Sequence, residues 1–257
     1  MYYLARTQML SNYTYPESLR IASNLGYDGA EISVLDKNFK IRSDFFNKDV
    51  IKEMKSELTK MKSVSISCHI DYINSDENFN IIIKAFAVAQ ELGIDIIIIN
   101  GALSTSKSKE DKKKEWEKMI LKTYQLCLEA EKKGIKLAKE FEPNFIAGNT
   151  EQMLRVFKEV NSACLYANID LGHVFLCDPD PMQALDNLQG KIIHGHIENM
   201  KKNIHDHLLP DDGDMDLNLY LNKLNEIGFG GPLALDLYKY DYEKVSKKCL
   251  KYLKNLL

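Results

Sequence analysis

The feature that most constrains the fold is an alternation of short apolar runs and longer amphipathic segments, which repeats eight times along 257 residues. Apolar runs that are bounded by turn residues and separated by helical segments predict buried strands of a parallel sheet. These strands are expected over residues 2–6, 28–33, 64–69, 94–100, 135–140, 165–170, 192–197 and 232–237. The helices between them are expected over residues 16–25, 44–61, 77–92, 109–133, 150–160, 180–188, 217–227 and 241–256.

Eight strand–helix units in about 250 residues are typical of a (β/α)8 TIM barrel. A doubly wound sheet is the alternative, and such a sheet normally carries a glycine-rich phosphate loop after its first strand. Here the first strand is followed by RTQMLSNYTY, which contains no glycine. No linker or low-complexity run divides the chain, so we expect a single barrel domain over residues 1–257.

The composition argues against a nucleic-acid or membrane partner. The net charge is −3 and the sequence pI is about 6.1, and the lysine-rich run at 107–118 is interleaved with four acids, as on a solvated helix face. No apolar stretch approaches the ~18 residues of a membrane span. The N-terminus lacks a signal-peptide pattern, and the five cysteines form no CxxC pair, so we expect reduced thiols in a cytoplasmic protein. The sequence is compatible with a homo-oligomer.

Five of the six histidines lie between residues 165 and 207, at positions 173, 194, 196, 205 and 207. Asp170 ends one predicted strand of this stretch, and His196 lies at the end of the next. Because parallel strands of a barrel end at the same face, these two side chains are expected to lie close together. A carboxylate beside a neutral imidazole favours a divalent metal of intermediate hardness.

Polar residues at the predicted strand ends extend this site around the barrel mouth. They are Glu31, His69, Asn100, Glu140, Asp170, His196 and Asp236. Four of them lie on four successive strands and would surround one divalent ion, which we expect to be Mn²⁺, Co²⁺, Mg²⁺ or Zn²⁺: Glu140, Asp170, His196 and Asp236. Coordination positions would remain for substrate oxygens.

Six motifs resemble the xylose isomerase-like TIM barrels: GYDGAEI, KLAKEFEP, NIDLGH, HGHIE, HLLPDDGDMD and GPLALDLY. That superfamily includes sugar and sugar-phosphate isomerases and epimerases, inosose dehydratase and the endonuclease IV type of DNA-repair enzyme. The resemblance covers nearly the whole chain and is strongest from 134 to 240. It implies a metal held by the same four residues, and it implies that His173 reaches a substrate oxygen or a further metal. Glu142 replaces Glu140 in this set if the fifth strand is shifted in register.

The chain departs from the family pattern at two positions. The acid of the eighth strand is usually Glu, whereas Asp236 is shorter by one methylene, which puts its dual role as ligand and base in doubt. The late loop normally reads H-x-x-x-G-x-G, whereas Asp211 stands where the first glycine after His207 belongs. An extra acid near the mouth would disfavour a phosphorylated substrate.

The nuclease branch of the superfamily gathers three zinc ions, and this chain lacks part of that ligand set. His69 matches one histidine of the branch, but Asn100 replaces a second, and His205 stands where the Asp-x-His pair of the late loop has its Asp. We therefore expect one metal, and an endonuclease is a less favoured alternative.

These features lead to the hypothesis of an isomerase or epimerase that acts on a small sugar through an enediolate. Glu140 and Asp236 would exchange the proton from opposite sides of the reacting carbon. Substrate contacts are expected from His173, His69, His207 and Lys202, the histidines at 205 and 207 lying in a loop that closes over the substrate. A dehydratase of an inosose-like keto-polyol, an endonuclease and a non-catalytic sugar-binding barrel are the alternatives.

Overall fold

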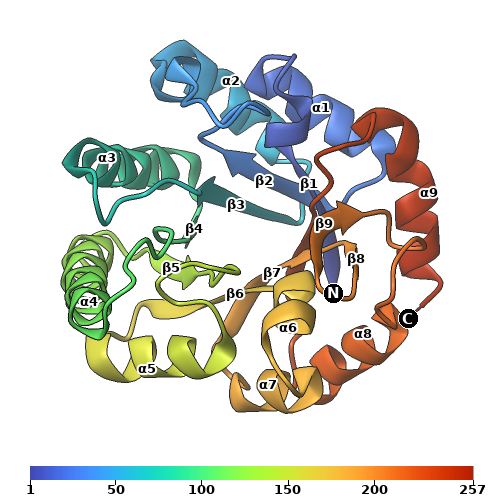
Figure 1. Cartoon of the computed structure of the whole chain (residues 1–257). Coiled ribbons are helices and arrows are strands. Elements are labelled where there is room, and N and C mark those ends of the chain that lie inside the picture. Colours follow the sequence, from blue (N-terminus) through green and yellow to red (C-terminus); the bar gives the residue numbers. More distant parts are fainter. Residues whose placement is uncertain (257) are drawn as a thin grey trace.

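Eight parallel strands close into a barrel in the computed structural model, which describes residues 1–256 (Figure 1). The strands follow chain order around the barrel, and the last one, β10, closes the ring between β7 and β1. Their bounds are β1 (Tyr2–Arg6), β2 (Gly29–Ser33), β3 (Ser63–Cys68), β4 (Ile96–Ile99), β5 (Lys136–Lys139), β6 (Leu165–Asp170), β7 (Ile192–Ile197) and β10 (Pro232–Leu235). The predicted (β/α)8 barrel is thereby confirmed.

Helices surround the barrel and cover its outer face (Figure 1). They are α1 (Tyr15–Leu25), α2 (Lys48–Leu58), α3 (Asp76–Leu92), α4 (Lys109–Glu131), α5 (Thr150–Val160), α7 (Pro181–Asn187), α8 (Leu217–Glu226) and α9 (Tyr242–Lys254). The predicted helix 44–61 is divided into a 3₁₀ turn, Ser43–Phe46, and α2, because the extended Asn47 caps α2 through its side chain. Among residues 1–256, no helix combines the length and the apolar character that a membrane crossing requires.

Three elements near the barrel mouth are absent from the sequence prediction. A 3₁₀ turn, Thr7–Leu10, follows β1, and a short helix, α6 (Leu171–Cys177), follows β6 directly, with its first turn capped by Asp170. The segment expected to be a loop over the substrate is an antiparallel hairpin of β8 (Asn199–Lys201) and β9 (Ile204–Leu208). Its turn contains Asn203 at a φ of 63°, a left-handed conformation that Asn tolerates.

The close approach of neighbouring strands depends on glycine at position 29. Gly29 is paired in register with Leu4 of β1 and with Ser63 of β3. A Cβ atom built on Gly29 would lie 1.7 Å from the Ser63 carbonyl oxygen and 2.9 Å from a methyl carbon of Leu4. No side chain therefore fits at this position without separating β2 from β3.

We expect Gly29→Ala to destabilise the fold by about 1–3 kcal/mol, because the added methyl group would collide with backbone atoms. Urea unfolding gives this free energy. Gly230→Ala is the matched control, since a Cβ atom there meets nothing within 4 Å. Equal stability of the two variants would show that the spacing of β2 and β3 is not limited by Gly29.

Candidate active site

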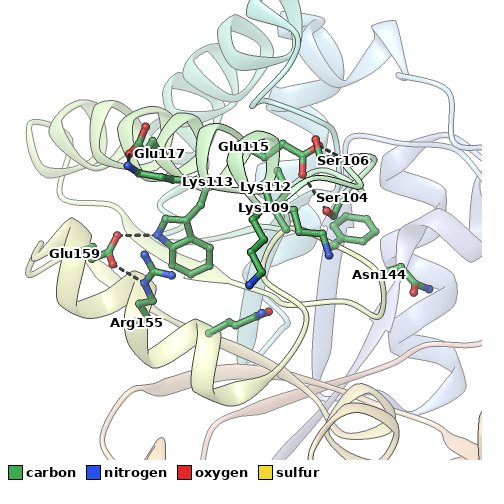
Figure 2. A pocket seen from close by; sticks show the side chains of 14 residues that line it. Ser104, Ser106, Lys109, Lys112, Lys113, Glu115, Glu117, Asn144, Arg155 and Glu159 are labelled. Carbon is green, nitrogen blue, oxygen red and sulfur yellow. Dashed lines mark hydrogen bonds and ion pairs between the residues drawn. The ribbon is translucent and has the colours of Figure 1, made fainter.

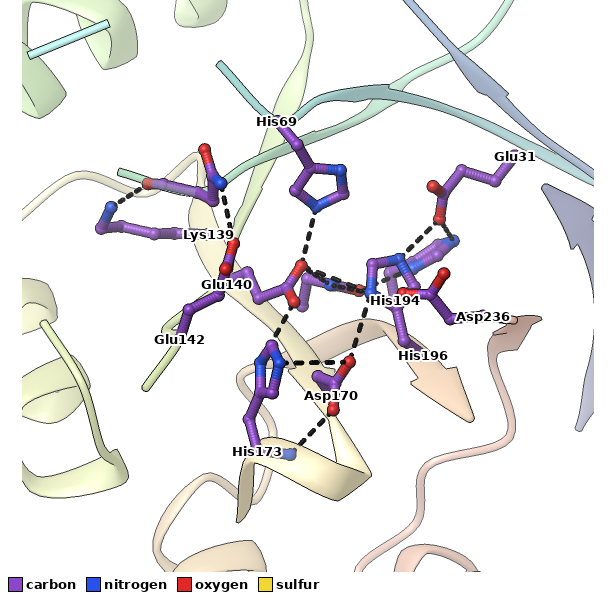
Figure 3. A network of polar contacts seen from close by, with 12 residues as sticks. Glu31, His69, Lys139, Glu140, Glu142, Asp170, His173, His194, His196 and Asp236 are labelled. Carbon is purple, nitrogen blue, oxygen red and sulfur yellow. Dashed lines mark hydrogen bonds and ion pairs between the residues drawn. The ribbon is translucent and has the colours of Figure 1, made fainter. Parts of the chain in front are cut away.

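A cavity of about 210 Å³ opens at the C-terminal mouth of the barrel. Its lining comes from most of the strand ends and from the β8–β9 hairpin. The lining residues are Arg6, Phe39, His69, Asn100, Glu140, Glu142, Phe145, His173, His196, His205, His207, Asp236 and Tyr238. Most of the residues predicted for the site are therefore brought to one cavity, and Asp170 lies buried beside them (Figure 3).

Glu140 lies directly after β5 and is the centre of the contacts in Figure 3. Its Oε2 accepts hydrogen bonds from His69 Nε2 at 2.8 Å and from Asn168 Nδ2 at 2.7 Å. Its Oε1 lies 3.4 Å from His173 Nδ1. Burial would raise the pKa of Glu140, but the neighbouring imidazoles of His196 and His69 outweigh burial and lower it. The carboxylate therefore stays ionised although it is only 4% exposed.

His196 is held by a carboxylate on the side that faces away from Glu140. Its Nε2 donates to Glu31 Oε2 at 2.8 Å, and its Nδ1 lies 3.3 Å from Glu140 Oε2 and 3.8 Å from Asp170 Oδ2. This orientation presents Nδ1 to the two carboxylates, as in metal sites where a second carboxylate orients the ligating histidine. Burial would lower the pKa of His196, but Glu31 and Glu140 raise it well above its usual value.

Asp170 ends β6 and has one oxygen without a partner. Its Oδ1 accepts the backbone N–H of His173 at 2.8 Å, whereas Oδ2 is buried and receives no hydrogen bond. Burial, and then the charge of Glu140, raise the pKa of Asp170. Together with Glu198, His207 and Asp236, Asp170 offers ligand atoms that all lie within 4.8 Å of one another.

Asp236 follows β10 and is paired with Arg6, a residue that the sequence analysis did not select. The Arg6 guanidinium, 1% exposed, contacts Asp236 Oδ1 through Nη1 and Glu31 Oε1 through Nε at 2.8 Å. Burial would raise the pKa of Asp236, but Arg6 and the imidazoles of His207 and His196 together outweigh burial and lower it. Arg6 ends β1 and is polar, the property by which the other strand ends were selected, so inspection of the first strand would have found it.

A second layer of polar residues fixes the orientation of this site. His194 Nδ1 donates to Asn168 Oδ1 at 2.7 Å, and its Nε2 lies 2.9 Å from the Ser65 hydroxyl. Burial lowers the pKa of His194 to about 3, so the ring is neutral. Because its carbonyl oxygen is held by His194, Asn168 directs its amide N–H toward Glu140.

Glu198 is a further buried carboxyl group that sequence reasoning missed. It lies directly after β7, two residues beyond His196, and its Oε1 accepts the Gly172 N–H at 3.0 Å while Oε2 has no partner. Burial and the charge of Asp170 raise its pKa well above its usual value. A Cβ atom on Gly172, the glycine of the NIDLGH motif, would lie 2.3 Å from Glu198 Oε1, so a side chain there would displace the Glu198 carboxyl group.

Three histidines approach one another at the side of the cavity formed by the β8–β9 hairpin. His173 Nδ1 donates to the Phe141 carbonyl oxygen at 2.9 Å, and its Nε2 lies 3.0 Å from His205 Nε2. His207 Nδ1 lies 3.6 Å from Asp236 Oδ2. Together, His173, His205 and His207 form another group of converging ligand atoms.

Two expectations about charged residues near the mouth are not supported by the structure. Lys202 is exposed in the hairpin turn, where its N–H donates to Asp214, and it does not line the cavity. The β8–β9 hairpin, which the sequence did not predict, carries it away from the substrate face. Asp211 pairs with Lys248 at 2.6 Å and is also absent from the lining.

A larger hollow of about 670 Å³ lies on the outside of the barrel between α4 and α5 (Figure 2). Trp116 Nε1 donates to Glu159 at 2.7 Å, and Arg155 covers the indole ring. The lysines of this region lie on an exposed face of α4, where Lys113 and Lys114 are within 4 Å of acids of the same helix. The predicted solvated helix face is thereby confirmed.

Comparison with known proteins identifies the family. The family model described as xylose isomerase-like TIM barrel matches residues 19–256. This chain belongs to that family.

Other members of the xylose isomerase-like family differ in the reactions they catalyse. The chain is 24% identical over 252 residues to the inosose isomerase of Bacillus velezensis, with 92% of this chain and 88% of the relative covered. It is 20% identical over 247 residues to the L-ribulose-5-phosphate 3-epimerase UlaE of Salmonella typhi, with coverage of 91% and 86%. The crystal structure of the IOLI protein with a binding zinc atom has the same fold, with a TM-score of 0.83, 20% identity and coverage of 100% and 96%.

In this xylose isomerase-like barrel, we expect Arg6→Met to lower the free energy of unfolding by about 3–5 kcal/mol, because it leaves two buried carboxylates without their guanidinium. Chemical denaturation measures the loss. The control is Arg20→Met, since Arg20 is 53% exposed and lies 3.7 Å from its partner Glu57, so its removal should cost less than about 1 kcal/mol. Similar losses in the two variants would contradict a central role for Arg6.

Proposed function

We propose that this protein is a metal-dependent isomerase or epimerase of a small sugar. The observation that carries the proposal is the cluster of buried carboxyl groups beside the cavity. Five carboxyl groups there are buried, and Arg6 is the one Arg or Lys side chain of residues 1–256 that forms an ion pair with any of them: Glu31, Glu140, Asp170, Glu198 and Asp236. Carboxylates this deeply buried are ionised together only where additional positive charge lies beside them.

The available ligand atoms fit a divalent cation. Asp170 Oδ2 is buried and unpartnered, and His196 Nδ1 faces both Asp170 and Glu140. Glu140, Asp170, His196 and Asp236 would hold the ion, a mixed oxygen and nitrogen set that suits Mn²⁺, Co²⁺, Zn²⁺ or Mg²⁺. When bound, such an ion acts as a Lewis acid that polarises a carbonyl oxygen and stabilises negative charge on the substrate. The zinc-bound relative and the isomerase and epimerase relatives support this assignment.

Glu140 and Asp236 are proposed as the acid–base pair. Both line the cavity, and they come from opposite parts of the ring, since β6 and β7 separate β5 from β10 on one side and four strands separate them on the other. Arg6 and the neighbouring imidazoles lower the pKa of Asp236 and keep it ionised, so Asp236 can remove the proton on the carbon next to the substrate carbonyl. The electron pair of the broken C–H bond passes into an enediolate. Glu140, after it takes up a proton from water, returns that proton to the same carbon on the other face, and this completes an epimerisation.

The cavity lining favours an uncharged sugar. Among the described residues that line it, Arg6 is the one Arg or Lys, and its guanidinium is already engaged by Glu31 and Asp236. A phosphate group would find imidazoles but no unpaired guanidinium or ammonium group in this lining. His69, His173 and His207 line the cavity and are proposed to contact substrate oxygens.

A dehydratase is the second candidate, and one observation favours it. Glu142 also lines the cavity, its Oε1 accepts from Asn100 Nδ2 at 2.8 Å, and burial together with the charge of Glu140 raises its pKa. A carboxyl group that keeps its proton can donate it to a departing hydroxyl group. Product analysis separates the two reactions, because only a dehydratase releases water from the sugar.

The test is exchange of the substrate α-proton in deuterated water, followed by NMR over a panel of unphosphorylated ketoses and keto-polyols with Mn²⁺ present. We expect the wild-type protein to exchange this proton with at least one of them. Asp236→Asn and Glu140→Gln should each slow exchange by roughly 10²–10⁴-fold, the loss typical of a positioned acid or base.

Asp178→Asn is the matched control for this experiment. Asp178 is a half-buried carboxyl group that accepts hydrogen bonds from Thr150 and does not line the cavity, so its variant should exchange at the wild-type rate. Wild-type exchange by Asp236→Asn would overturn the two-carboxylate mechanism. A wild-type protein that exchanges no proton of any sugar would overturn the proposed function itself.

A further inference from the structure

Phe39 is the most exposed large hydrophobic residue among residues 1–256, at 62% exposure, and it nevertheless lines the candidate active-site cavity. The free energy falls when the apolar surface of an aromatic side chain is removed from water. An aromatic ring left exposed at the edge of a polar cavity is therefore a candidate contact for whatever enters that cavity.

The backbone of Phe39 adopts a conformation that a bulky residue avoids. Its φ is 59°, in the left-handed region, where Gly or Asn is favoured and where a Cβ atom costs free energy. The other three residues with positive φ that are not glycine are asparagines, at 144, 161 and 203. Among residues 1–256, Phe39 is thus the one aromatic residue whose backbone is left-handed.

The turn that contains Phe39 is stabilised by Asp36 and not by the ring. Leu35 and Ile41 pair as an antiparallel bridge, and the Asp36 N–H donates to the Lys40 carbonyl oxygen at 2.8 Å. Asp36 Oδ1 accepts the N–H groups of Asn38 and Lys40 at 2.8 and 2.9 Å. A glycine would fit the same turn without strain, so folding of the turn does not explain the aromatic side chain.

The ring of Phe39 continues an aromatic wall that leads to Asp236. It stacks on Tyr238 with ring centroids 5.6 Å apart and planes inclined by 23°. The Tyr238 ring also contacts the edge of His207, at 5.0 Å. The Tyr238 hydroxyl accepts from Arg6 at 2.8 Å and lies 3.4 Å from Asp236 Oδ2. The wall therefore begins at the proposed base and ends at Phe39, on the outer edge of the cavity.

We propose that Phe39 is a substrate-binding residue that determines specificity, its ring packing with Tyr238 against the C–H face of the sugar. This inference rests on the proposed function, because it places the substrate between Asp236 and Phe39. The end of the substrate that lies on Phe39 then carries no anionic group and presents carbon-bound hydrogens, since the negative face of an aromatic ring offers an anion no compensation for lost hydration. The strained turn is retained because it carries the ring over the cavity.

The test compares Phe39→Gly with Phe39→Tyr by steady-state kinetics and thermal unfolding. Phe39→Gly should raise KM about ten-fold with little change in kcat, while its melting temperature stays equal or rises because the strain is relieved. Phe39→Tyr keeps both the ring and the strain, and its KM should stay within about two-fold of the wild-type value. Asn161→Gly, a left-handed position at the end of α5 and outside the cavity, should leave KM unchanged.

Two outcomes separate failure of this inference from failure of the proposed function. A wild-type protein that turns over sugar, together with Phe39→Gly at wild-type KM for every accepted substrate, would overturn the role of Phe39 and leave the function intact. If the wild-type protein turns over no sugar, the proposed function fails, and calorimetric titration with the same sugars still tests the ring. Equal affinities of wild-type and Phe39→Gly proteins, or no binding by either, would then overturn the inference as well.

Discussion

The ion pairs of Arg6 are the interaction on which the rest of the site depends. One guanidinium at the end of β1 contacts Glu31 from β2 and Asp236 from the residues after β10, and all three side chains are almost completely buried. Buried charges are costly unless their partners are well placed, so this cluster defines how the first, second and last strands meet at the mouth. Glu31 extends the cluster to β7, because its other oxygen accepts from His196.

This arrangement divides the carboxylates of the mouth into two groups. Arg6 and the imidazoles keep the pKa values of Glu31, Glu140 and Asp236 low, whereas burial and like charge raise those of Asp170, Glu142 and Glu198. Asp236 is thus shared between a guanidinium and the proposed metal site. Although Asp is one methylene shorter than the Glu that is usual in this family, its carboxylate still reaches Arg6.

The barrel and most of the site could be predicted from the sequence, because the C-terminal ends of the strands converge in this fold. Glu140, Asp170 and His196 could be placed together once their strands were recognised. Glu198 was missed although it was predictable, because alternation along a strand places a residue two positions past His196 on the same face of the barrel. Lys202 was misplaced because β8 is only three residues long, too short to show the alternation of apolar and polar residues that predicts a strand.

The central claim is that a single divalent ion binds among Glu140, Asp170, His196 and Asp236. Anomalous diffraction from crystals soaked in Mn²⁺, with data collected on both sides of the manganese absorption edge, locates the ion directly. The structure predicts one anomalous peak per chain, within coordination distance of these four side chains. A peak among His173, His205 and His207 instead, or no peak at an Mn²⁺ concentration that supports turnover, would contradict the claim.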